Sequence, residues 1–353
     1  MRKQEETNYE VIIVGAGPSG LAAALTLLEE GISDVIVIER FKFPRYKCCA
    51  GYIIGKTKAV YETFGLNIEE AHYSLIRDFN IFYRLKKRQT ILNKFLYTNR
   101  TIDRVELDNA FAELAKSKGI QIKENTTISE HDADKKELKL SNGEILTYEK
   151  LIFADGTSGF GSRLQPDRKK NIAMQLVFPN SAAEEIQIHF GITKRGYGWV
   201  SSYGGFTNVG LTDVFDKSVN YHEIFADFMK KLGLQADMSR LRGAFTPMEI
   251  GEGKVGEDVY FVGDAVGACD PMTLSGLRYS LDSGRLCAEA IARKDDCLYF
   301  ACIRKMKKKF ALMRALQKIF YLKFCQVCVF DIGCRCFHRA IAYVFNHFFV
   351  NKK

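Results

Sequence analysis

Residues 10–40 read EVIIVGAGPSGLAAALTLLEEGISDVIVIER. An apolar, β-branched run at residues 11–14 predicts a strand that is buried on both faces. A glycine-rich turn at residues 15–20 ends this strand, and residues 21–30 continue with helical periodicity. A second apolar run at residues 35–38 predicts another buried strand. This order of strand, glycine turn, helix and strand is typical of a dinucleotide-binding unit in a doubly wound α/β fold.

The glycines and the acid of this stretch have distinct expected roles. Gly15 permits a tight turn, Gly17 lets backbone N–H groups approach a pyrophosphate, and Gly20 lets the helix pack closely on the strand. The N-terminus of the helix offers unpaired N–H groups and a positive dipole end to the phosphates. Glu39 ends the second strand, where an acid hydrogen-bonds an unphosphorylated adenosine ribose. The stretch therefore predicts FAD or NAD rather than NADP.

The composition excludes several classes of protein. The chain has 353 residues, enough for a large core, and its first ten residues, MRKQEETNYE, lack the apolar segment of a secretory signal. No uninterrupted apolar run approaches about twenty residues, so a spanning helix is not expected. Ten cysteines without a signal peptide indicate a reduced, cytoplasmic setting. Much of the net charge of +9 lies beyond Arg293, and without a nucleic-acid motif it favours an anionic membrane surface over nucleic acid.

A second cofactor signal lies at residues 259–267, which read VYFVGDAVG. An apolar strand leads to Gly263 and Asp264, and a helix opens near Gly276 and Leu277. We expect Asp264 to accept a hydrogen bond from a ribityl hydroxyl. The start of the helix is expected to face the flavin edge on which reduction builds negative charge.

Three pieces of the sequence resemble the FAD-dependent oxidoreductases of the p-hydroxybenzoate hydroxylase fold. They are VGAGPSG…ER at residues 14–40, LIFADG at residues 151–156, and GDAVGACDPMTLSGLRYSLDSG at residues 263–284. Within that superfamily the chain most resembles the geranylgeranyl reductase family, over residues 9–295. The resemblance implies bound FAD and an α/β (α+β overall) architecture, in which a Rossmann-like FAD-binding domain carries an inserted antiparallel β-sheet substrate domain and C-terminal helices.

Shorter matches point to the family's functional loops. Residues 47–51, KCCAG, are similar to its K-P-C-G-G loop, with Cys49 at the cysteine. Arg104 matches the arginine that opens its cofactor-contacting helix, and residues 197–199, YGW, match the Y-x-W portion of its substrate-side sheet. The chain departs from the pattern where Leu274 replaces the first glycine of P-x-x-G-x-G. Other departures are Cys48 for proline, Ala50 for glycine, Phe153 for the first glycine of G-A-D-G, and Ser201-Ser202 for Phe-Pro.

The motifs and the resemblance together predict three groups of site residues. The expected catalytic residues are Cys49, Tyr52 and Tyr197, and the expected substrate wall is Tyr197 and Trp199. The expected FAD contacts are Gly15, Ala16, Gly17, Pro18, Ser19, Gly20, Glu39, Arg40, Cys49, Ala50, Gly51, Arg104, Ile128, Asp264, Gly276 and Leu277. The predicted segments are 1–72, 100–165 and 251–295 for the FAD-binding domain, 73–99 and 166–250 for the substrate domain, and 296–353 for the C-terminal helical region.

The C-terminal region is basic, aromatic and rich in cysteine. Apolar residues recur at helical spacing after the basic run at residues 304–309. This pattern is compatible with peripheral membrane contact through residues 304–350 or with packing of this region on its own protein. Both interpretations stay open. The residues Cys325, Cys328, Cys334, Cys336 and His338 do not follow a standard zinc spacing, so no metal site is expected.

The resemblance implies reduction of carbon–carbon double bonds in a prenyl chain or a prenylated lipid. Reduced flavin would supply a hydride and a positioned acid would supply a proton. The expected electron donor is NAD(P)H or a ferredoxin, because the sequence holds no second GxGxxG motif. Two alternatives stay open: a monooxygenase or halogenase of the same superfamily, and a non-catalytic flavin-binding protein at a membrane.

Overall fold

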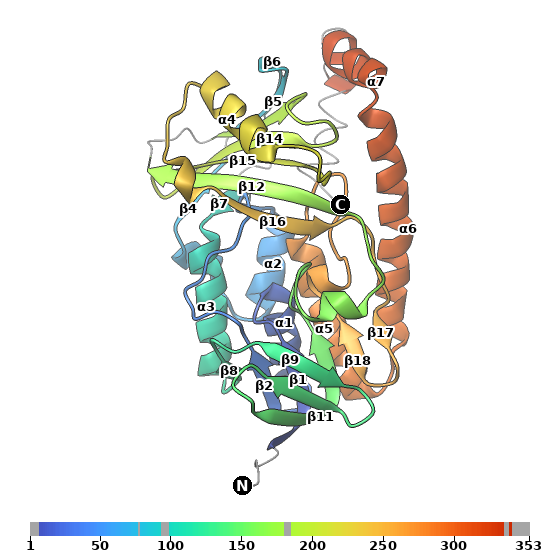
Figure 1. Ribbon diagram of the computed structural model, residues 1–353. Helices are drawn as coiled ribbons and strands as arrows, with labels where there is room; N and C mark the ends of the chain where they lie inside the picture. The colour runs from blue at the N-terminus through green and yellow to red at the C-terminus, as the bar shows by residue number, and fades with distance from the viewer. Residues whose placement is uncertain (1–6, 77, 93–98, 180–184, 335–338, 341–353) are drawn as a thin grey trace.

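The computed structural model describes residues 7–76, 78–92, 99–179, 185–334 and 339–340. Two main sheets lie one above the other in Figure 1, with helices packed around the lower sheet and one long helix along the side. The mixed α/β fold predicted from the sequence is confirmed.

The lower sheet has a parallel core, as the buried apolar runs predicted. Its strand order is β17-β18-β11-β1-β2-β8, and β1 pairs in parallel with both β11 and β2. Its strands are β1 (Thr7–Val14), β2 (Val35–Ile38), β8 (Gln121–Lys123), β11 (Ile145–Phe153), β17 (Lys254–Val255) and β18 (Val259–Phe261), with β9 (Ile128–Asp132) and β10 (Glu137–Leu140) attached through β11. The central position of β11 brings the chain around residue 150 between segments that are distant in sequence.

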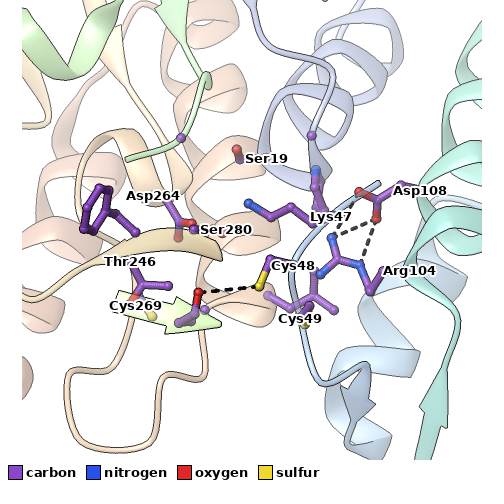
Figure 2. A pocket seen from close by; sticks show the side chains of 18 of the residues that line it. Ser19, Lys47, Cys48, Cys49, Arg104, Asp108, Thr246, Asp264, Cys269 and Ser280 are labelled. Atoms are coloured by element: carbon purple, nitrogen blue, oxygen red, sulfur yellow. Dashed lines mark hydrogen bonds and ion pairs between the residues drawn. The ribbon is translucent and has the colours of Figure 1, made fainter. Parts of the chain in front are cut away.

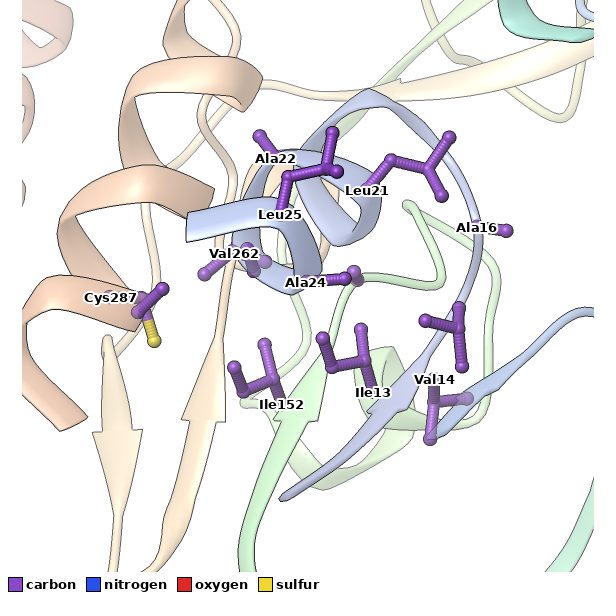
Figure 3. Packing of buried hydrophobic residues seen from close by; sticks show 14 of the residues in the cluster. Ile13, Val14, Ala16, Leu21, Ala22, Ala24, Leu25, Ile152, Val262 and Cys287 are labelled. Atoms are coloured by element: carbon purple, nitrogen blue, oxygen red, sulfur yellow. The ribbon is translucent and has the colours of Figure 1, made fainter. Parts of the chain in front are cut away.

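Helix α1 (Pro18–Glu29) packs closely on this sheet because its first turn carries glycine. A Cβ at Gly20 would overlap the carbonyl oxygen of Gly15, and Gly15 itself has a φ of +107°. Figure 3 shows the small side chain of Ala24 on the side of the helix that faces Ile13 and Ile152 of the sheet. The expected roles of the two glycines in the turn and in the helix packing therefore have a direct steric basis.

The upper sheet is mostly antiparallel. Its strand order is β16-β12-β15-β14-β13-β5-β6. Its strands are β5 (Asp78–Tyr83), β6 (Lys86–Leu92), β12 (Lys170–Pro179), β13 (Glu185–Phe190), β14 (Tyr197–Tyr203), β15 (Phe206–Val214) and β16 (Arg242–Pro247). The antiparallel sheet expected from the sequence contains one parallel pair, because β13 runs parallel to β5. Since β5 comes from a separate, earlier segment, no hairpin fixes its direction relative to β13.

Smaller elements connect the two sheets. The strands β3 (Tyr52–Ile53), β7 (Arg100–Ile102) and β4 (Tyr73–Leu75) form a three-stranded sheet. The connecting and covering helices are α2 (Gly55–Thr63), α3 (Arg104–Ser117), α4 (Tyr221–Lys231) and α5 (Leu277–Arg293), with short 3-10 turns at Ile68–Glu70, Gly161–Leu164, Met238–Arg240 and Gly263–Ala265. Asp103 caps α3, since its side chain accepts a hydrogen bond from the Val105 N–H at 2.8 Å.

The first part of the C-terminal helical region packs against the core of the lower sheet, and its end packs against the upper sheet. Helix α6 (Cys297–Phe320) runs along the length of the molecule and is followed by α7 (Lys323–Val327) and a π-helix (Cys328–Gly333). The ring of Phe330 stacks on Tyr83 with centroids 4.7 Å apart, and Phe320 meets Phe190 edge-on at 5.3 Å. No helix within the described chain is long and apolar enough to cross a membrane. Cys336, His338 and residues 341–353 lie outside the described residues.

The strand β11 runs without a break from Ile145 to Phe153 and includes the polar pair Glu149 and Lys150. Lys150 forms an ion pair with Asp258 beside the sheet. The strand β8 ends at Lys123, and β9 begins at Ile128.

Candidate functional site

A large cavity lies where the two main sheets meet. It has a volume of about 610 Å³ and is lined by residues of both sheets, of the loop after β2, and of the starts of α1, α3 and α5. Figure 2 shows Ser19, Asp264 and Ser280 on one side of the cavity and Arg104 and Asp108 on the other.

Most of the residues expected at the site line this cavity. Those that line it are Gly15, Gly17, Pro18, Ser19, Glu39, Arg40, Cys49, Ala50, Gly51, Tyr52, Arg104, Ile128, Tyr197, Trp199, Asp264, Gly276 and Leu277. Two of the expected cofactor residues do not reach its surface. Ala16 is fully buried behind the turn, and Gly20 packs against Gly15. The structure therefore brings segments from residues 15 to 277 to one cavity.

The start of α1 has the properties of a phosphate-binding site. Gly17 occupies the N-cap position without a side-chain cap, and the first turn carries no acidic residue. A Cβ at Gly17 would meet only the Nη2 atom of Arg45, at 3.9 Å, among the described residues. The space before this helix is thus open to a ligand, and the helix N-terminus favours an anion there.

Glu39 holds the glycine turn in place. Its carboxylate accepts hydrogen bonds from the backbone N–H of Ala16 at 2.9 Å and of Phe41 at 3.1 Å. The side chain is buried, and Arg45 lies 3.5 Å from its Oε2 atom. A further bond from Glu39 to a ribose stays a prediction.

A buried ion-pair network forms the wall at the start of α3. Arg104 donates three hydrogen bonds to Asp108, at 2.8, 2.9 and 3.1 Å, and Arg45 lies 3.4 Å from the same carboxylate. Burial alone would lower the pKa of Arg104, but Asp108 raises it above its usual range. Sequence reasoning found Arg104 and missed Asp108 and Arg45. The spacing of four residues between Arg104 and Asp108 was the available signal.

The upper sheet holds the cysteine loop by polar contacts. Gln175 accepts a hydrogen bond from the Cys49 N–H at 2.8 Å, and Asn208 donates to the Cys49 carbonyl at 3.0 Å. Ser201 donates to the Ala50 carbonyl at 3.2 Å. These three side chains, none of them predicted as site residues, fix the loop between the two sheets. The loop therefore has a defined conformation at the cavity wall.

The neighbouring Cys48 is a half-buried thiol that also lines the cavity. Its Sγ donates to the Ala173 carbonyl at 3.8 Å, the contact drawn in Figure 2. Burial raises the pKa of the Cys48 thiol to about 12. This environment favours the thiol form of Cys48 over the thiolate.

The two expected tyrosine acids are both weak. Asn99 donates to the Tyr52 hydroxyl at 3.2 Å, and the Tyr197 hydroxyl donates to the Thr273 carbonyl at 2.8 Å. Burial raises the pKa of both tyrosines above the usual range. Trp199 donates through Nε1 to Asn208 at 3.1 Å, which ties the aromatic wall to the residue that holds the cysteine loop.

Asp264 and the start of α5 lie together on the opposite wall. Gly276 is the N-cap of this helix, again without a side-chain cap or an acid in the first turn. A Cβ at Gly276 would lie 3.4 Å from the Oδ1 atom of Asp264. A carboxylate and an uncapped helix start thus face the cavity side by side, which suits a ligand that offers both hydroxyls and an electron-rich edge.

Asp155 lies just after the end of β11, and one oxygen of its carboxylate is buried. Its Oδ2 accepts a hydrogen bond from the Gly161 N–H at 2.8 Å, whereas Oδ1 is buried without a partner in the described part of the chain. Burial raises the pKa of Asp155 to about 6. An ionised Asp155 is therefore unfavourable in the protein without ligand.

We expect Asp155→Asn to remove a pH-dependent loss of stability. The unfolded pKa is near 4 and the folded one is about 6, so the contribution of Asp155 is fully present below about pH 4 and is lost as the pH rises through about 6. A shift of about 2 units corresponds to about 3 kcal/mol. Urea unfolding of the apo-protein should show the advantage of the Asn variant growing by this amount from about pH 4 to about pH 7.5. The prediction is wrong if the advantage is the same at both values.

The sequence matches the family described as "FAD binding domain" over residues 8–159. The chain carries an FAD-binding domain. The matched segment of that domain includes the glycine turn, Glu39 and Arg104, and FAD is the cofactor that these residues are expected to hold. The open space at Gly17 and the two uncapped helix starts fit a ligand with a pyrophosphate and a flavin ring.

Curated relatives cover most of the chain at low identity. A menaquinone reductase of Mycolicibacterium smegmatis is 25% identical, over 80% of this chain and 76% of its own length. A digeranylgeranylglycerophospholipid reductase of Methanocaldococcus jannaschii is 24% identical, over 81% of this chain and 77% of its own length. The second of these relatives confirms the resemblance to geranylgeranyl reductases within the FAD-dependent oxidoreductase superfamily.

Solved structures establish the fold beyond the FAD-binding domain. A geranylgeranyl bacteriochlorophyll reductase-like protein of Thermoplasma acidophilum superposes with a TM-score of 0.77 and 16% identity, covering 98% of this chain and 97% of that one. A flavin-dependent brominase superposes with a TM-score of 0.74 and 18% identity, covering 95% and 93%. The same fold thus occurs in flavoproteins described by different reactions.

No group of three or more His, Cys, Asp or Glu side chains in the described part of the chain is placed to hold a metal ion. Cys334 is buried in the aromatic cluster beside Phe330.

Proposed function

We propose that the protein uses reduced FAD to saturate carbon–carbon double bonds in a prenyl chain or a prenylated lipid. The apolar wall of the cavity is the observation that carries the proposal. Phe79, Ile186, Ile188, Tyr197 and Trp199 line the cavity and belong to one hydrophobic cluster of the upper sheet. Such a wall suits a hydrocarbon chain, and the same cavity is lined by groups that suit the cofactor. Menaquinone and digeranylgeranyl lipids, for which two relatives are named, both carry prenyl chains.

Bound FAD would supply the hydride for this reaction. Gln175, Asn208 and Ser201 hold the cysteine loop against the cavity, so that Cys49 and Tyr52 face the same space. The aromatic wall excludes water, which keeps the hydride from side reactions. A thiol or a buried tyrosine then delivers the proton to the second alkene carbon, and Cys49, Tyr52 and Tyr197 are the proposed donors. The proposed electron donor is NAD(P)H or a ferredoxin.

Mass spectrometry of lipids provides the test. The flavinated protein is reduced with dithionite without oxygen and incubated with geranylgeranyl lipids, and a gain of about two mass units per double bond is expected, since each step adds a hydride and a proton. Cys49→Ser should retain FAD and lose turnover if the thiol is the proton donor. A protein that leaves all isoprenoids unchanged contradicts the proposal. Oxygen insertion or halogenation in air would then favour the oxygenase alternative, and inertness in both tests a non-catalytic flavoprotein.

We further propose that the outer face of α6 and α7 contacts the cytoplasmic face of an anionic membrane. Large apolar side chains are exposed there within a short segment, Phe324 by 77%, Leu322 by 57% and Leu312 by 56%. Lys318 and Lys323 are exposed in the same segment. An apolar face among cations suits anionic lipid headgroups.

Vesicle binding tests this contact. Leu322→Ser combined with Phe324→Ser should lower the fraction of protein that sediments with vesicles of phosphatidylglycerol and phosphatidylcholine at least about fivefold, because each change removes apolar contact with lipid. Leu298→Ser is the matched control, since Leu298 is 55% exposed at the other end of α6. Equal binding by the double variant and the control would contradict the contact.

A further inference from the structure

Leu274 has a backbone conformation that a leucine rarely adopts. Its φ is +54°, in the left-handed region where a Cβ is disfavoured. Arg84, Leu85, Asn125, Lys136 and Lys294 are the other described non-glycine residues with positive φ, and none of them lines the cavity. Leu274 does line it. A strained position that faces a ligand cavity points to a functional reason for its side chain.

The surrounding chain holds Leu274 firmly in this conformation. The buried carboxylate of Asp270 accepts hydrogen bonds from the backbone N–H of Met272 at 3.0 Å and of Thr273 at 3.2 Å. The carbonyl of Asp270 accepts a third from the Leu274 N–H at 2.8 Å. The turn is therefore fixed from within, and Leu274 has little freedom to withdraw from the cavity.

The side chain of Leu274 lies between the two functional walls of the cavity. It packs against the hydrophobic cluster that contains Tyr197 and Trp199. The Tyr197 hydroxyl donates to the carbonyl of Thr273, the residue before it. Two residues later, Gly276 begins the helix that is expected to face the flavin. With FAD and a prenyl chain bound as proposed, Leu274 would lie between them.

We propose that Leu274 sets the width of the substrate compartment and so selects single prenyl chains over bulkier prenyl lipids. This inference rests on the proposed function. A glycine fits the same backbone conformation without strain, so removal of the side chain enlarges the cavity and leaves the turn intact. The opening affects the apolar side of the cavity and leaves the contacts at the start of α1 unchanged.

Ligand binding to the oxidised holoenzyme tests the inference. The probes are farnesol, geranylgeraniol and digeranylgeranylglycerol, and flavin fluorescence reports their binding. The quantity compared is the dissociation constant of digeranylgeranylglycerol divided by that of farnesol or of geranylgeraniol. Leu274→Gly should shift this ratio toward digeranylgeranylglycerol at least about tenfold, and Leu274→Phe should shift it in the opposite direction. Leu85→Gly is the matched control, because Leu85 is also a leucine at positive φ, +63°, and lies away from the cavity.

The outcomes separate this inference from the proposed function. A wild-type holoenzyme that binds none of the three isoprenoids overturns the proposed function, and the inference falls with it. A wild-type protein that binds them, with the same ratio in Leu274→Gly and Leu85→Gly, overturns the inference alone. If Leu274→Gly fails to retain FAD, the Leu274→Phe variant provides the test instead. An unchanged ratio of dissociation constants in Leu274→Phe would then overturn the inference.

Discussion

Gly17→Ala is expected to weaken FAD binding at least about 30-fold, roughly 2 kcal/mol, without changing the stability of the apo-protein. Gly17 has φ −78° and ψ 178°, which alanine adopts readily. Its Cβ would meet only the Arg45 Nη2 atom, at 3.9 Å, within the described structure. The added methyl group projects into the space through which the pyrophosphate approaches the helix N–H groups.

The measurement is a titration of the apo-protein with FAD, paired with its urea unfolding. Gly20→Ala is the control, because a Cβ at Gly20 would overlap the Gly15 carbonyl oxygen. We expect Gly20→Ala to lose stability and FAD together, since it pushes α1 away from β1, whereas Gly17→Ala loses FAD alone. Tight FAD binding by Gly17→Ala would show that the pyrophosphate does not pass over this residue.

Asp108→Ala should reduce the unfolding free energy by about 3–5 kcal/mol. The Asp108 carboxylate is almost completely buried and neutralises Arg104, whose side chain is 6% exposed. It also accepts a hydrogen bond from Arg45 at 3.4 Å. Its removal leaves a buried guanidinium without a carboxylate, and this desolvated charge is the source of the expected loss.

Urea unfolding of the apo-protein measures this loss. Asp227→Ala is the matched control: Asp227 also pairs with a cation four residues away, Lys231, but both side chains are more than half exposed. We expect that control to change stability by less than about 1 kcal/mol, because exposed ion pairs contribute little. Combining Asp108→Ala with Arg104→Met should restore part of the lost stability. A loss below about 1 kcal/mol in Asp108→Ala would contradict the importance of the buried pair.

Local sequence signals located much of the fold and part of the candidate site. The glycine turn was predictable because its steric demands arise between near neighbours, as the contact between Gly15 and Gly20 shows. Asp264 and Gly276 were predictable for the same reason, since each adjoins the end of a strand or the start of a helix.

Contacts between distant segments left no such signal. Gln175 and Asn208 hold the cysteine loop across more than a hundred residues of sequence, and the residues around them give no sign of that contact. The parallel pairing of β13 with β5 likewise joins two segments whose order in the sheet depends on the whole fold. The strain at Leu274 depends on its backbone angles. The sequence indicated it only through the leucine that replaces a glycine of the family's motif.

The position of β11 at the centre of the lower sheet has a consequence for synthesis of the protein. β1 leaves the ribosome first, but its parallel partner spans residues 145–153 and the next strand begins at Val259. The cofactor cavity is complete only after Gly276 and Leu277 have been translated. During that interval β1 can pair with β2 but lacks β11, and such long-range parallel pairing forms slowly. We therefore expect one edge of β1 to stay unpaired on nascent chains until residues 145–153 have emerged.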